Sequence, residues 1–290
     1  MPEEKEFFGN FATVVGRVNS KQMKDFGSGL GKLSLNVNDG KAFVDLWNPK
    51  DTNVVESFFH EINEGEKIQL RGEIQESYYN ENYNRRLRPF IPKTGVEYSV
   101  KSDDVEEKFN AALSGDVVKM EMKYDEDGAP SMELIFVILN LYNPNTKEND
   151  LTRQEVLIRE LENYKDYVSN RDDMPGREEI VEKLINKTKS DDSRENIYKV
   201  LMKFYDRFNP RMWNINILHL TAFDDIAQEI ADKVDEYDNC QFGVSVYNMR
   251  DEDEFGFING IINKVEIKKI NQVVKQEESL EEDDDFLGDW

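Results

Sequence analysis

Short segments of alternating apolar and polar residues fill the first hundred positions and predict β-structure. The Asn-Asp-Gly turn at 38–40 lies between two such segments, which is a strong hairpin signal. Residues 52–63 instead carry apolar side chains at helical spacing, with Thr52 as the expected N-cap. The expected strands are 11–18, 33–37, 41–47, 66–74 and a short one near 88–92. Three strands, a helix and two further strands is the element order of an OB-fold, a small Greek-key barrel.

A weaker copy of the same order follows, interrupted by about sixty residues of helical pattern. The helical stretch, at about 150–208, opens on a capping box at 152–155, and Asp224 is the expected cap of a later helix. The expected strands of the copy are 114–124, 131–142, 213–220, 240–246 and 256–267.

These patterns predict a mainly β protein with a helical insertion, of the α+β class. We expect an OB-fold domain at 1–100, a second OB-like domain at 101–275 and a disordered acidic tail at 276–290. The alternative is a single α+β domain that carries one N-terminal barrel.

The composition limits the kinds of covalent bond, metal site and membrane segment that the protein can contain. A single cysteine excludes an internal disulfide, and with only two histidines it argues against a Cys/His zinc site, so we expect neither metal nor cofactor. No apolar run approaches the roughly 20 residues that span a membrane, and the start lacks the features of a signal peptide. We therefore expect a soluble cytoplasmic protein without membrane contact.

The net charge of −23 argues against a nucleic-acid partner, but it is unevenly distributed. Residues 1–100 have a net charge of only −2, whereas residues 277–290 contribute −8. Charges further apart than a Debye length of roughly 8 Å are largely screened, so the local balance decides. A nucleic-acid site is therefore to be sought in the first hundred residues.

The third predicted strand directs two aromatic rings outward. Lys41 and Asp45 are costly to bury, so the face that they occupy is expected to be exposed. Phe43 and Trp47 share that face because side chains alternate along a strand, and Lys32 lies beside them on the paired strand. Exposed aromatics on the second and third strands of an OB barrel are typical of single-strand binding.

The segment 76–90 interleaves tyrosines with arginines and reads as a loop. Rings stack on bases for roughly 1–3 kcal/mol each, and guanidinium groups bind phosphates. The candidate residues for binding single-stranded DNA are Arg17, Lys32, Lys41, Phe43, Trp47, Arg71, Tyr78, Tyr79, Tyr83, Arg85, Arg86 and Arg88. The alternative is that Phe43 and Trp47 pack against the helical insertion or a partner subunit, and that the loop is only solvated.

The carboxy-terminal sequence EESLEEDDDFLGDW ends an acidic run on apolar residues. With the predicted barrel, this tail resembles the single-stranded DNA-binding proteins of bacteria and bacteriophages. The matching tail residues are Asp283, Asp284, Asp285, Phe286, Leu287 and Trp290. The helical insertion and the second barrel depart from the bacterial pattern and look more like a phage-encoded variant, which leaves the oligomeric state open.

The resemblance implies a non-enzymatic protein that coats single-stranded DNA during replication, recombination or repair. It also implies that the tail competes with DNA for the basic groove and recruits replication or recombination proteins, with Trp290 as an anchor. Three alternatives stay open: an acidic interaction module or DNA mimic without DNA contact, a purely solubilising tail, and a two-metal nuclease built from the many acidic residues.

Overall fold

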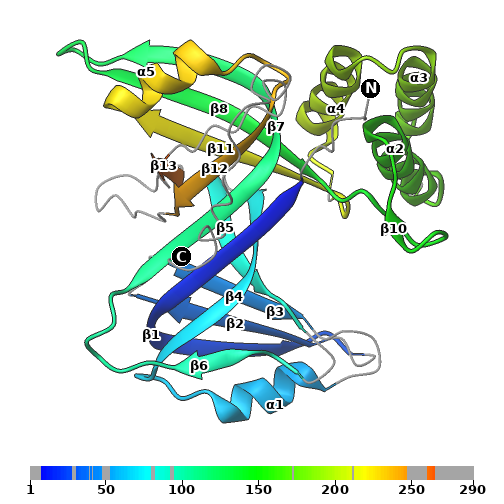
Figure 1. Ribbon diagram of the computed structural model, residues 1–290. Coiled ribbons are helices and arrows are strands. Elements are labelled where there is room, and N and C mark those ends of the chain that lie inside the picture. Colours follow the sequence, from blue (N-terminus) through cyan, green and yellow to red (C-terminus); the bar gives the residue numbers. More distant parts are fainter. Residues whose placement is uncertain are drawn as a thin grey trace.

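The first barrel is closed by five strands in the computed structural model (Figure 1). They are β1 (Gly9–Asp25), β2 (Gly31–Val37), β3 (Ala42–Trp47), β4 (Lys67–Tyr79) and β5 (Asn82–Pro89). The pairing order is β1-β2-β3-β5-β4, β4 pairs again with β1, and only the β3–β5 pair is parallel. Helix α1 (Val54–Glu61) packs Val55 and Phe58 into the core, and β6 (Tyr98–Val100) extends the sheet beside β4.

The structure describes part of the chain. The described residues are 8–27, 31–38, 40, 42–47, 53–79, 82–91, 95–171, 173–210, 212–246 and 260–264.

The second barrel repeats the pairing of the first. Its strands are β7 (Lys108–Tyr124), β8 (Pro130–Leu139), β11 (Ile215–Phe223), β12 (Asn239–Ser245) and β13 (Gly260–Lys264). The order is β7-β8-β11-β13-β12, β12 returns to β7, and β11–β13 is the parallel pair. Helix α5 (Asp224–Lys233) precedes β12, as α1 precedes β4. The predicted fold class is thereby confirmed, whereas the domain boundaries drawn at 100 and 275 remain a prediction.

The helical insertion lies to one side of the second barrel (Figure 1). It consists of α2 (Arg153–Ser169), α3 (Arg177–Ser190) and α4 (Arg194–Phe208), preceded by the short strands β9 (Tyr142–Asn143) and β10 (Glu148–Asn149). The predicted capping box is present at Thr152 and Glu155. The helices share one apolar core with residues from the outer side of the barrel: Val137, Leu139, Ile215 and Ile217.

A buried carboxylate anchors the insertion. Asp116 on β7 is fully buried and accepts hydrogen bonds from Arg153 Nε at 2.5 Å, from Asn239 Nδ2 at 2.7 Å and from the Tyr198 hydroxyl. Burial and, after it, the Asp116 charge raise the pKa of Tyr198 well above its ordinary value of 10.0. Donors from three residues around one carboxylate satisfy a charge that would otherwise be costly in the interior.

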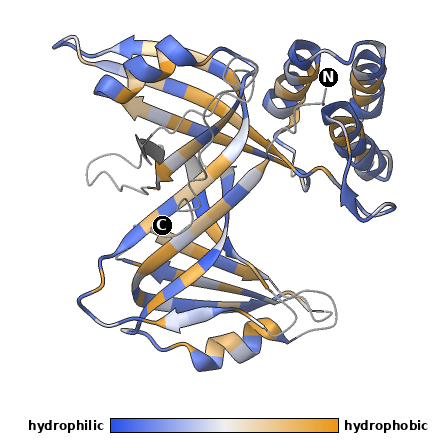
Figure 2. Ribbon diagram, viewed as in Figure 1, coloured by the Kyte–Doolittle hydropathy of each residue, from blue (hydrophilic) through white to orange (hydrophobic). Residues whose placement is uncertain are grey.

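The two barrels are joined through their backbones and side chains. Strands β1 and β7 pair antiparallel, from Gly9 opposite Ser114 to Val15 opposite Lys108, which links both barrels into one sheet. The β4–β5 hairpin reaches from the first barrel to β11 of the second, as Figure 1 shows. Its Glu76 and Arg85 contact His219 there. In Figure 2, the long strands β1 and β7 carry both hydrophobic and hydrophilic positions.

Several boundaries differ from the sequence-based expectation. The largest difference is at 76–90, predicted as a loop, which forms most of a β-hairpin with Tyr78 opposite Tyr83. In the sequence, the charged residues of this segment are typical of a solvated loop. In the structure, Glu76 and Arg85 form a buried ion pair with each other. The helix N-caps are Asn53 and Phe223, not Thr52 and Asp224.

The turn between β2 and β3 follows the sequence. Asn38 has a φ of 57° and Gly40 a φ of 88°, a left-handed backbone that asparagine and glycine tolerate best. The predicted hairpin is thus present.

Candidate nucleic-acid interface

Strand β3 separates an apolar inner face from a mixed outer face. Ala42, Val44 and Leu46 are at most 1% exposed. Phe43, Asp45 and Trp47 alternate with them and are half-buried on the other side. The predicted alternation is therefore observed, and neither ring is sealed in the barrel core.

Each outward ring has an aromatic or cationic neighbour. The Trp47 ring stacks on Phe26, with centroids 5.6 Å apart and planes inclined by 16°. Lys32 Nζ lies 5.2 Å from the Trp47 ring, and the Arg86 guanidinium lies 5.8 Å from the Phe43 ring. Rings flanked by cations combine base stacking with phosphate binding on one surface.

Asp45 lies between the two rings and holds both cations in place. Its carboxylate is 2.7 Å from Lys32 Nζ, and Arg86 Nη1 donates to both carboxylate oxygens at 2.8 and 2.9 Å. Ser34 Oγ donates to it at 2.8 Å. We call the surface formed by Phe26, Lys32, Phe43, Asp45, Trp47 and Arg86 the β3 face.

Two of the predicted basic residues lie elsewhere. Arg17 on β1 donates to Asp103 at 2.6 Å and to the backbone carbonyl of Gly65. Arg71 is exposed on β4, which β5 separates from β3. The structure therefore does not bring these two cations to the β3 face.

Arg88 follows Arg86 on β5, in the strand next to β3, and pairs with Glu73 of β4 at 3.6 Å. Burial raises the pKa of the Glu73 carboxyl, against the opposing charge of Arg88. Beyond this pair, Phe11 and Phe90 form an exposed aromatic pair with centroids 6.0 Å apart. Arg88 thus lies between the β3 face and a second aromatic patch.

Arg85 was predicted to bind phosphate, and its position also requires a correction. Its side chain is 2% exposed, pairs with Glu76 at 2.7 Å and donates to the backbone carbonyl of His219 at 2.7 Å. Arg85 shares the inward side of β5 with the fully buried Leu87, whereas Arg86 points to the other side. It therefore joins the barrels instead of facing a ligand.

The structure describes the remaining candidates only as backbone or not at all. Lys41 and the tail residues from Asp283 to Trp290 are outside the described residues. Of Tyr78, Tyr79 and Tyr83, only the backbone is described, on the β4–β5 hairpin.

Sequence reasoning missed two members of the β3 face. Phe26 follows β1 in a glycine-rich segment that gave no periodic signal. Asp45 was expected to be exposed but not to bridge two cations from β2 and β5, because its partner Arg86 is 41 residues away in the chain.

Within the described ranges, no group of three or more His, Cys, Asp or Glu residues is arranged to hold a metal ion. In the same part of the chain, no helix has the length and apolar character needed to cross a membrane.

In each barrel the five strands, numbered in chain order, are paired in the order 1-2-3-5-4, and β1 of the first barrel pairs with β7 of the second. These features define a tandem OB-fold protein. No protein-family model and no curated protein matches the sequence. Among solved structures, the wild-type single-stranded DNA-binding protein from Thermus aquaticus matches with a TM-score of 0.50 and 11% identity. The match covers 90% of this chain and 93% of that one.

The other matches include two further structures. A deletion mutant of the Thermus aquaticus protein gives the same TM-score of 0.50 and 11% identity, over 90% of this chain and 95% of that one. The second single-stranded DNA-binding protein of Mycobacterium smegmatis covers 34% of this chain and 97% of its own, with a TM-score of 0.25 and 17% identity. At such low identity, the Thermus aquaticus matches establish a shared fold over most of both chains.

Proposed function

We propose that this protein binds single-stranded DNA without sequence preference and has no catalytic activity. The observation that carries the proposal is the β3 face, where Phe43 and Trp47 are turned away from the barrel core and flanked by Arg86 and Lys32. Rings that accept any base and cations that accept any phosphate give affinity without reading the sequence.

In the proposed binding step, DNA phosphates replace the Asp45 carboxylate as the partner of two cations. Without DNA, the Asp45 carboxylate holds Lys32 and Arg86. When a strand approaches, its phosphates bind these two cations while its bases stack on Phe43 and Trp47. The stack of Phe26 on Trp47 fixes the tryptophan ring, so less conformational entropy is lost on binding.

The solved structures with a similar fold support this proposal, because the Thermus aquaticus structures are of single-stranded DNA-binding proteins. The acidic interaction module remains the competing hypothesis, since the whole chain carries a net charge of −23.

A mobility-shift assay with labelled oligo-dT, duplex DNA and RNA distinguishes the two hypotheses. The wild-type protein is expected to bind oligo-dT, and Phe43→Ala/Trp47→Ala should weaken binding by at least about 30-fold, from roughly 1–3 kcal/mol per ring. Phe11→Ala/Phe90→Ala is the matched control, because it removes two exposed rings outside the β3 face. Equal binding by both double variants would refute the proposed surface, and metal-dependent loss of the oligonucleotide would revive the nuclease hypothesis.

We further propose that the protein acts in replication, recombination or repair, in the cytoplasm of a bacterial host if it is phage-encoded. In this proposal the acidic tail, including Phe286, Leu287 and Trp290, competes with DNA for the cations of the β3 face and binds partner proteins. Deletion of residues 277–290 should raise the affinity for oligo-dT at low salt. A lower affinity of the truncated protein would contradict the competition.

A further inference from the structure

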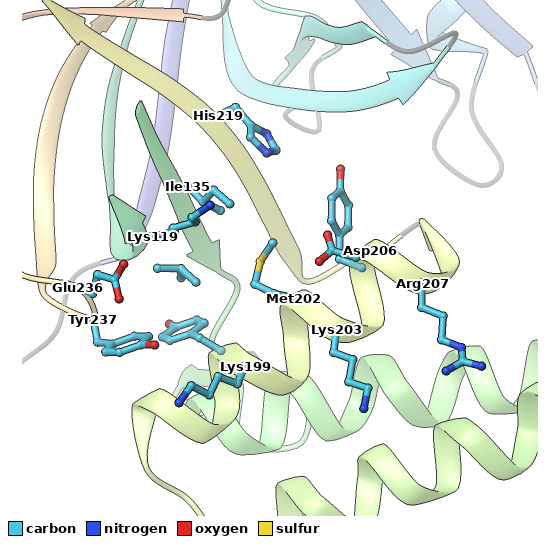
Figure 3. Close-up of a pocket in the computed structure, with 13 residues that line it drawn as sticks. Lys119, Ile135, Lys199, Met202, Lys203, Asp206, Arg207, His219, Glu236 and Tyr237 are labelled. Carbon is cyan, nitrogen blue, oxygen red and sulfur yellow. The ribbon is translucent and has the colours of Figure 1, made fainter. Parts of the chain in front are cut away.

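A cleft of about 880 Å³ lies between helix α4 and the outer side of the second barrel (Figure 3). Strands β8 and β11 provide one wall, with Ile135 and His219 projecting from it. Helix α4 provides the other wall, where Met202 points toward the barrel. The cleft is large enough for a nucleotide and is outside the β3 face.

The barrel wall of the cleft is formed by strands that correspond to those carrying the β3 face in the first barrel. Strands β8 and β11 hold the positions in the second barrel that β2 and β3 hold in the first. The helical insertion covers one part of their outer side, where Val137 and Ile217 join the helical core. Further along the same strands, Ile135 and His219 line the cleft.

The helix supplies aromatic and basic groups to this cleft. Tyr205 lines it from α4, and Tyr237 lines it from the segment before β12. Three exposed cations, Lys199, Lys203 and Arg207, recur every four residues along α4, about 6 Å apart along the helix axis. Figure 3 shows them on the side of α4 turned away from β11, where they form an outer rim to the cleft.

The acids nearby only partly offset this rim. Glu195 bonds to Lys199, which raises the pKa of that ammonium group. Asp206 and Glu236 also line the cleft, and Lys119 adds a cation on the barrel side. Cations, tyrosines and an apolar floor suit an anionic ligand with flat rings.

The β4–β5 hairpin connects the β3 face with the cleft. Arg86 of the β3 face is followed toward the hairpin tip by Arg85, which donates to the backbone carbonyl of His219. Glu76 Oε1 is 2.5 Å from His219 Nδ1, and the His219 side chain lines the cleft. The two surfaces are therefore separated by one pair of strands.

We infer that a single strand of DNA that is bound on the β3 face continues past His219 into the α4 cleft, where it forms a second subsite. The inference rests on the proposed function and adds a role for the helical insertion. Bases would contact Tyr205 and Tyr237, and phosphates would contact Lys203 and Arg207.

The test compares oligo-dT of about 8 nucleotides, within the length that one OB-fold binds, with oligo-dT of about 30 nucleotides. Lys203→Glu/Arg207→Glu should bind the long strand about tenfold more weakly and lose about 1.4 units of the slope of log K against log salt, while the short strand binds as in wild type. Circular dichroism and thermal unfolding verify that the variant folds.

The matched control is Lys183→Glu/Lys187→Glu. These two lysines are exposed on α3 and are not among the residues that line the cleft, and the control carries the same change in charge. It should bind the long strand with nearly wild-type affinity.

The outcomes separate this inference from the proposed function. If the long strand binds equally well to the α4 variant and to wild type, while Phe43→Ala/Trp47→Ala weakens its binding, the second subsite is refuted and the function stands. An equal loss in the α4 variant and in the α3 control would also refute the subsite, because net charge would explain it. If wild type binds neither strand, the proposed function fails.

Discussion

Arg86 and Asp45 form an ion pair on the outer side of the first barrel, with Nη1 at 2.8 and 2.9 Å from the two carboxylate oxygens. The pair connects β5 to β3 and lies beside the Phe43 ring. Asp45 thus already occupies the position of an anion between two cations and two aromatic rings. In the proposed function, a DNA phosphate has to compete with this carboxylate.

Asp45→Asn should therefore strengthen binding to oligo-dT. The amide keeps the shape and an acceptor for Ser34 but removes the charge that holds Lys32 and Arg86. We expect about a tenfold higher affinity at low salt, and a smaller gain as salt screens the charges. Fluorescence titration of oligo-dT at several salt concentrations measures the effect.

The control for this change is Asp103→Asn, which removes the partner of Arg17 away from the β3 face. It should alter the affinity much less. Equal gains in both variants would indicate a general effect of net charge and would count against Asp45 as a local competitor.

Phe26→Ala should weaken binding although this residue was not expected to take part. Without the stacked ring, Trp47 has to be immobilised when DNA binds, which costs about 0.5–1.5 kcal/mol and corresponds to roughly a two- to tenfold loss of affinity for oligo-dT. Phe90→Ala is the matched control, an exposed ring paired with Phe11 elsewhere. Unchanged affinity in Phe26→Ala would show that Trp47 needs no support.

Arg85→Met should destabilise the protein by about 3–5 kcal/mol, because it leaves the Glu76 carboxylate, 1% exposed, without its guanidinium partner. Urea unfolding measures the loss. Glu76→Gln/Arg85→Met should recover part of it, since no uncompensated charge remains.

Arg88→Met is the matched control on the same strand. Its partly exposed pair with Glu73 should contribute no more than about 1 kcal/mol. If Arg85→Met and Arg88→Met lose the same stability, the buried Glu76–Arg85 pair contributes no more than the exposed Glu73–Arg88 pair, which would contradict the prediction.

Stability at alkaline pH should depend on Tyr198. Its folded-state pKa is raised by burial and by Asp116, so folding favours the neutral phenol. The resulting stability is fully present below the unfolded-state pKa of about 10 and is lost as pH rises toward the folded-state pKa.

Tyr198→Phe should therefore lose stability less steeply above pH 10 than wild type, by up to about 1.4 kcal/mol per pH unit. Its stability at neutral pH should be lower, because Asp116 loses one of its donors. Urea unfolding at a series of pH values gives both quantities. Parallel curves for the two proteins above pH 10 would contradict the prediction.

The sequence by itself determined the parts of the fold that depend on neighbours within a few residues. The two-residue period of β3 was sufficient to place Phe43 and Trp47 on the other face of the strand from Val44, because alternation is a property of any strand. The Asn-Asp-Gly turn and the capping box at Thr152 were equally local. The order of elements then predicted the OB-type barrel and its interrupted copy.

Only the tertiary structure decided how distant residues pair. The Arg85 guanidinium donates to the backbone carbonyl of a residue 134 positions away, and this partner turns a predicted loop into a buried strand that joins the barrels. The stack of Phe26 on Trp47 and the position of α4 over β8 and β11 likewise depend on packing. A charged side chain reads as solvated in a sequence, since its burial is favourable only where the fold supplies an opposite charge.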